Sequence, residues 1–175
     1  MSRKGWAIIF ICIFIILSIL GMVINTKLFA PKKIHYHAGF VVFENDKRQD
    51  FSDVKYMHIK PCTVKGKDNT ESESDEDNQI EKAHLHDYVG DVVHVHREDV
   101  IWKDLFTNLK YNIDYAKATA YINGKEVKNF QDQEIQPYDS LIVFIGKNNI
   151  KEHLSEGVNK SHIQSVEKKS EECGS

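Results

Sequence analysis

The chain has 175 residues, of which 41% are hydrophobic and 28% charged, and its formal net charge is −3 at pH 7. This length and composition allow one compact domain with additional terminal segments and exclude collagenous and wholly disordered proteins. The slightly acidic charge, with no basic stripe interleaved with aromatic residues, argues against nucleic acid as a partner. The three cysteines, Cys12, Cys62 and Cys173, form no CxxC motif and no evenly spaced set, so they indicate no disulfide scaffold.

A long apolar run follows a short basic region at residues 1–5. Residues 6–24 read WAIIFICIFIILSILGMVI and carry no charge. As a helix they would extend about 28 Å, close to the roughly 30 Å thickness of the hydrocarbon core of a bilayer. We therefore expect an uncleaved transmembrane helix at 6–24, followed by a linker at 25–33. A cleaved secretory signal is the alternative, but LFA at 28–30 is a poor cleavage site.

The basic residues beside this run barely distinguish its two possible orientations, since Arg3 and Lys4 precede it and Lys27, Lys32 and Lys33 follow it. A two-residue basic region directly before the apolar run is typical of a signal anchor, which exports the residues that follow. We therefore expect a single-pass protein of the cell membrane whose soluble domain lies outside the cytoplasm.

A histidine-rich α+β domain is predicted at residues 34–146. The segment 35–43 is apolar and rich in β-forming residues, and turn residues at 44–47 lead to a returning strand at 48–51, so we predict a β-hairpin. Residues 54–59 are predicted to form another short strand, which carries His58. His58 is either a further metal ligand or an ordinary surface residue.

An acidic insertion interrupts this domain at residues 66–81, which read GKDNTESESDEDNQIE. This composition buries too little apolar surface to offset the entropy of ordering, so we expect a disordered surface loop. A calcium site is the alternative, but the segment lacks the glycine and terminal glutamate of an EF-hand loop.

The second half of the domain contains a strand, a helix, a hairpin and a final strand. The alternation at 92–96 predicts a half-buried strand, and Asp99 can cap a helix at about 100–109 whose apolar residues form one stripe. Asn123-Gly124 predicts a hairpin turn, and SLIVFIG at 140–146 predicts a buried strand.

The C-terminal segment 147–175 has few apolar residues and many lysines, glutamates and serines, so we expect a disordered polar tail. His153 and His162 are isolated within it, and we treat them as ordinary polar residues.

The remaining histidine pattern carries the functional prediction, because six of the nine histidines form three His-X-His pairs. Alternate residues of a β-strand share a face, about 6.6 Å apart along the strand, so both rings of a pair can reach one ion. Imidazole suits zinc, copper and nickel, and a zinc site takes three or four ligands. We therefore predict a zinc or copper site, and the candidate ligands are His35, His37, His84, His86, His94 and His96.

Other interpretations of these residues stay open. Asp87 and Asp91 are plausible additional ligands or groups that orient the imidazoles. Histidine also alternates with valine in a half-buried strand that needs only some polar residue facing outward. A metal-free module that binds a protein or a small ligand is therefore one alternative function, and a zinc-dependent hydrolase is another. The absence of HExxH, of a phosphate-binding glycine loop and of a nucleophile elbow argues against an enzyme.

The strand at 92–96, the helix at 100–109, the YINGKEV hairpin and the closing IQPYDSLIVFIG together resemble the second half of a β-grasp, ubiquitin-like domain. Together with the apolar run at 6–24, these patterns predict an α+β fold, in which an N-terminal transmembrane helix precedes a small β-rich domain with one main helix that is β-grasp-like in its C-terminal half. The sulfur-carrier activity of some β-grasp proteins does not transfer, since it needs a C-terminal Gly-Gly and this chain ends Cys-Gly-Ser. The whole chain also resembles histidine-rich, single-pass membrane proteins of archaea and candidate-phylum bacteria, a resemblance that implies no particular function.

Overall fold

The computed structural model describes residues 34–58 and 79–169, all within the unit Ile34–Ser175. A mixed β-sheet forms the centre of this unit, with the strand order β3-β4-β1-β7-β5-β6 and with β2 paired to β1. The strands are β1 (Tyr36–Glu44), β2 (Lys47–Arg48), β3 (Ala83–His84), β4 (Val92–Val95), β5 (Thr119–Ile122), β6 (Lys125–Val127) and β7 (Ser140–Ile145).

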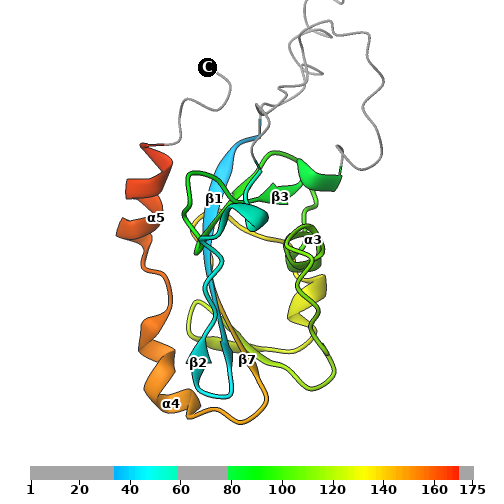
Figure 1. Ribbon diagram of the computed structural model, residues 1–175, viewed down its shortest axis with the longest axis vertical. Helices are drawn as coiled ribbons and strands as arrows, with labels where there is room; N and C mark the ends of the chain where they lie inside the picture. The colour runs from blue at the N-terminus through cyan, green and yellow to red at the C-terminus, as the bar shows by residue number, and fades with distance from the viewer. Residues whose placement is uncertain (1–33, 59–78, 170–175) are drawn as a thin grey trace, which may run out of the picture. The chain divides into compact units, whose positions relative to one another are not determined.

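The central strand β1 pairs in parallel with β7 on one side and antiparallel with β4 on the other. Its sequence is almost continuously apolar because both of its faces are covered. Phe40 and Val42 face one hydrophobic core, whereas Val41 and Phe43 face another on the opposite side of the sheet. Figure 1 shows helix α3 (Trp102–Asn108) on one side of the sheet and α5 (Lys160–Glu167) on the other.

The larger core lies under α3, whose Trp102, Leu105 and Phe106 are buried. The helix predicted at 100–109 is thus confirmed, but its predicted cap is wrong. Ile101 is the N-cap residue, and its backbone N–H donates to the Asp104 carboxylate over 3.1 Å.

Both predicted hairpin turns are confirmed, although the returning strand of the first hairpin is Lys47–Arg48 and not the predicted 48–51. The β1–β2 turn has Asn45 and Asp46 at φ 52° and 64°, and the β5–β6 turn has Asn123 and Gly124 at φ 53° and 76°. Two successive positive φ values match the twist of the flanking strands, and asparagine, aspartate and glycine adopt them most readily.

The short strand predicted at 54–59 is replaced by the 3₁₀ helix η1 (Val54–Tyr56), whose N-terminus is capped by the Asp53 side chain. Met57 then forms a parallel bridge with Leu85, and the His58 backbone N–H donates to the Leu85 carbonyl over 2.8 Å. These contacts place residues 57 and 58 beside β3.

The segment after β7 packs against the sheet, in contrast to the expected disordered tail. It forms α4 (Ile150–His153), the 3₁₀ helix η3 (Leu154–Glu156) and α5. Val158, Ile163 and Val166 are buried in the core on the β1 face opposite α3. Gly39 permits this approach, because a Cβ atom there would collide with the side chain of Val158.

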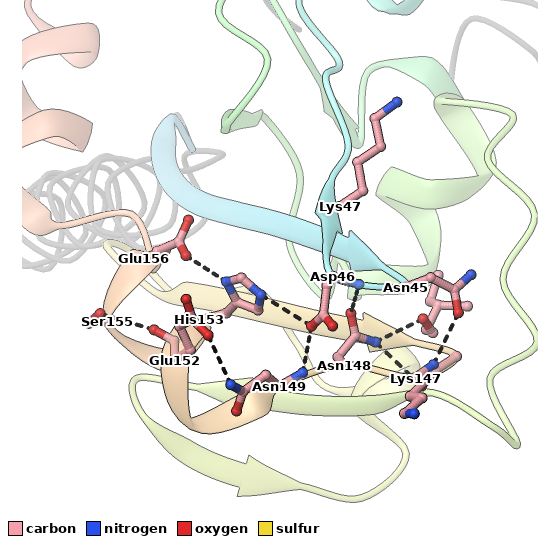
Figure 2. A network of polar contacts seen from close by, with 12 residues as sticks. Asn45, Asp46, Lys47, Lys147, Asn148, Asn149, Glu152, His153, Ser155 and Glu156 are labelled. Atoms are coloured by element: carbon pink, nitrogen blue, oxygen red, sulfur yellow. Dashed lines mark hydrogen bonds and ion pairs between the residues drawn. The ribbon is translucent and has the colours of Figure 1, made fainter.

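Polar contacts also tie this segment to the β1–β2 turn (Figure 2). The Asn149 backbone N–H donates to Asp46, and Asp46 also lies 3.3 Å from Nε2 of His153. The other ring nitrogen of His153 contacts Glu156 at 2.6 Å, and the ring stacks on Phe43. His153 is therefore part of the folded domain.

The predicted fold class needs correction. No helix in the described residues is long and apolar enough to cross a membrane, and the expected span at 6–24 lies outside them, as do 1–5 and the linker 25–33. The described domain is a mixed sheet with helices on both faces, so the expectation of one main helix is also wrong.

The acidic insertion lies outside the described residues as far as residue 78. Its last residues contact α3, where Asn108 Nδ2 donates to the Gln79 carbonyl over 2.9 Å. Glu81 is buried and pairs with Arg97 at 2.6 Å. The end of the insertion thus belongs to the folded domain.

Candidate metal centre

Seven histidines gather on the sheet face that α5 also occupies. In the strand register, His94 of β4 lies opposite both His37 of β1 and His84 of β3, and directly opposed residues point to the same face. Val92, two residues before His94, packs in the same core as Ile163 of α5, which identifies the face. The seven histidines are the six predicted ligands, His35, His37, His84, His86, His94 and His96, together with His58.

The six predicted ligands form two groups of three. His35, His37 and His94 make one group, called here the first triad, and the second triad is His84, His86 and His96. Within each triad, one nitrogen from each ring lies within 4.8 Å of the other two. Each triad therefore has the composition and compactness of a site that could hold a metal ion.

In the first triad, Nε2 of His37 lies 3.0 Å from Nδ1 of His94. The His35 ring lies at an edge of the His37 ring, with centroids 4.8 Å apart. On the other side of His37, Nδ1 is 3.8 Å from a carboxylate oxygen of Glu167, at the end of α5. The ring of His37 thus directs Nε2 into the triad and Nδ1 toward a carboxylate.

In the second triad, a backbone contact fixes the tautomer of one ring. Nδ1 of His84 lies 2.9 Å from the Ile80 carbonyl oxygen, which can only accept a hydrogen bond, so Nδ1 carries the proton. In the neutral ring, Nε2 of His84 then has its lone pair available, and it lies 2.8 Å from Nε2 of His86. A metal-binding histidine is commonly oriented by such a hydrogen bond from its other nitrogen.

The two triads adjoin each other. The ring centroids of His35 and His96 are 4.7 Å apart in a stacked arrangement, and those of His86 and His94 are 4.6 Å apart. His58 extends the cluster, with its ring 4.8 Å from His84 and 5.9 Å from His86. The bridge between Met57 and Leu85 therefore places His58, which the sequence left undecided, beside the second triad.

Burial keeps these imidazoles neutral. Desolvation, reinforced by the neighbouring rings, lowers the pKa of His37 to about 4 and that of His96 to about 3. Desolvation likewise lowers the pKa of His84, His86 and His94. Metal ions bind neutral imidazole, so at neutral pH no proton must leave these rings before an ion binds.

Nε2 of His94 and Nε2 of His96 are buried and have no hydrogen-bond partner among the described residues. A buried polar atom left without a partner costs about 1–3 kcal/mol of stability. Coordination of an ion through either atom would satisfy it.

The aspartates considered from the sequence lie elsewhere. Asp91 accepts from Arg48 at 3.1 Å and contacts Nε2 of His162 at 3.0 Å. Asp87 is exposed, and its charge acts on the pKa of His86 only as a minor influence beside desolvation. Among the described residues, Glu167 places a carboxylate beside a ring nitrogen of the cluster, that of His37. The sequence did not indicate Glu167, because its segment was expected to be disordered.

No family model, curated protein or solved structure matches the chain. The β-grasp resemblance and the resemblance to histidine-rich membrane proteins therefore stay predictions, and the functional argument rests on the geometry of the cluster.

Proposed function

We propose that this domain binds a transition-metal ion, zinc or copper, through its buried histidine cluster. The support is the convergence of seven imidazoles from four neighbouring chain segments, which are residues 35–37, 57–58, 84–86 and 94–96. Nitrogen ligands suit zinc, copper and nickel, whereas calcium and magnesium select oxygen ligands.

The observation that carries the proposal is the pair of triads, each of which brings three imidazole nitrogens within 4.8 Å of one another. His94 is only 1% exposed, and the rings of His37 and His86 lie within 4.6 Å of its own ring. Coordination of a metal ion explains why so many basic side chains share one buried site.

The alternative, a metal-free module that binds a protein or small ligand, needs no such convergence. Its histidines would serve as solvent-facing polar residues of a half-buried strand. His37, His84, His86 and His94 are instead buried, at 1–6% exposure. Burial of this kind favours a role inside the domain over a role as a surface polar residue.

The test compares two double variants of the purified protein. Replacing His94 and His96 by alanine should abolish stoichiometric binding of Zn²⁺ in equilibrium dialysis with metal analysis. The fold should survive, because Val93 and Val95 on the opposite face keep β4 in the core.

The matched control replaces His153 and His162, which removes the same number of imidazoles at positions outside the cluster. This variant should keep full metal binding. Equal losses in both variants would indicate non-specific affinity of histidine for metal and would contradict the proposal, as would unchanged binding after loss of His94 and His96.

A further inference from the structure

We infer that the cluster holds two ions, one in each triad, with His58 assisting the second triad. This inference rests on the proposed metal-binding function. It assigns separate ligand sets to separate ions, which the histidine pattern in the sequence could not do.

Coordination geometry limits the number of imidazoles that one ion can bind. Zinc takes three or four protein ligands with Zn–N distances of about 2.0–2.1 Å, so nitrogens on one tetrahedral ion lie about 3.3 Å apart. Seven imidazoles exceed what one ion can accept. The two triads share no residue, and each brings three nitrogens within 4.8 Å of one another.

Two close pairs of ring nitrogens mark two different positions in the cluster. One pair is Nε2 of His37 with Nδ1 of His94, at 3.0 Å, and the other is Nε2 of His84 with Nε2 of His86, at 2.8 Å. Each pair lies close to the separation expected for two ligands of one ion, and the pairs use four different rings. Each pair therefore belongs to a separate metal centre. His35 completes the centre of His37 and His94, and His96 completes the centre of His84 and His86.

The surroundings of the two triads differ as well. His84 in the second triad is oriented by the Ile80 carbonyl, and the His58 ring lies next to it. His37 in the first triad has the Glu167 carboxylate beside it. The second triad thus has a fourth imidazole within reach, whereas the first has three imidazoles and leaves one position of a tetrahedral ion for water or another small ligand.

Electrostatics predicts how the two ions bind. The ligands are neutral imidazoles, so two nearby cations repel each other with little protein charge to compensate. The ions should therefore bind in two steps, with the second weaker than the first. Glu167 is the described carboxylate placed to offset part of this repulsion at the first triad.

The experiment measures Zn²⁺ stoichiometry of the full-length protein by calorimetric titration, with metal analysis after gel filtration. The native protein should bind two ions in two steps. The variant with His35 and His37 replaced by alanine should bind one ion, and so should the variant with His84 and His86 replaced. Circular dichroism checks the fold, and the single variants His35→Gln and His86→Gln replace any double variant that unfolds.

The possible outcomes distinguish failure of the two-ion inference from failure of the proposed metal-binding function. One ion in the native protein, lost in both double variants, would show a single shared centre and overturn this inference while leaving the proposed function intact. Two ions that are both lost when only one triad is removed would also overturn it. No stoichiometric ion in the native protein would overturn the proposed function itself.

Discussion

His37 and His96 show how burial sets the chemistry of single residues in the cluster. Their pKa values are lowered to about 4 and about 3, chiefly by desolvation and next by the neighbouring His35 ring. A histidine in an unfolded chain has a pKa near 6.5. Both residues are consequently neutral in the folded domain at a pH where the unfolded chain would already be protonated.

This difference predicts that the metal-free protein loses stability in acid. Between about pH 6.5 and pH 4 the unfolded state binds more protons than the folded state, so the free energy of unfolding falls as the pH falls. At pH 5, His37 and His96 should each lower it by about 2 kcal/mol relative to pH 8. Urea unfolding of chelator-treated protein across this pH range measures the slope.

The control is the variant with His37 and His96 replaced by glutamine, which cannot take up a proton. Its free energy of unfolding should change less steeply between pH 6.5 and pH 4. An identical slope in the native and variant proteins would show that these two residues are not held neutral by the fold.

For single residues, the sequence predicted the direction in which the histidine side chains point. It did not predict which other residues surround them. The i, i+2 spacing correctly predicted that His94 and His96 share a face opposite Val93 and Val95. It could not predict burial, because the covering contacts come from segments distant in the chain. His58 likewise reaches the cluster only through the bridge to Leu85.

Helix α5 is the element that links the C-terminal segment to the candidate site. Its Ile163 and Val166 pack on the sheet, and Glu167 at its end lies beside His37. The other carboxylate oxygen of Glu167 accepts from the Tyr138 hydroxyl at 2.8 Å. Helix α5 therefore places a carboxylate beside His37, and the hydrogen bond from Tyr138 fixes the position of that carboxylate.

We predict that Glu167 is a positioning residue for the first triad. Glu167→Gln should weaken the ion bound by His35, His37 and His94 by about 10–100-fold, the usual effect of losing a group that orients a metal-binding histidine. The ion of the second triad should keep its affinity, which calorimetric titration with Zn²⁺ can resolve.

Glu156→Gln is the matched control, since Glu156 contacts His153 and lies outside the cluster. It should leave both affinities unchanged. If Glu167→Gln weakens both ions alike, the residue acts through general stability of the domain and the positioning role is refuted.

The C-terminal segment also shows why an element can be missed. Its apolar residues are few, but Ile150 and Leu154, and then Ile163 and Val166, recur at helical spacing. The Asn159 side chain accepts from the backbone N–H of His162 at 2.8 Å and caps α5, a further signal that was present in the sequence. The expectation of a disordered tail used the average composition of the segment, which does not show these local patterns.

The whole domain assembles its site from segments that are far apart in the sequence. The elements β1, β4, α3, the β5–β6 hairpin and β7 follow the sequence patterns closely, because alternation, helical spacing and turn residues are local signals. The strand order and the parallel pairing of β1 with β7 depend on contacts across 100 residues or so, which no local pattern encodes. The strands β3, β4 and β1 are neighbours only in the assembled sheet. The sequence alone therefore could not show that the three histidine pairs lie side by side.

The central claim is that imidazoles of this sheet coordinate a metal ion, and X-ray absorption spectroscopy of the Zn²⁺-loaded protein tests it most directly. We predict a first shell of nitrogen atoms at about 2.0–2.1 Å, with the outer-shell scattering of imidazole rings and no sulfur near 2.3 Å. The variant lacking His94 and His96 should lose this spectrum. A shell dominated by sulfur or by carboxylate oxygen, without imidazole scattering, would contradict the account.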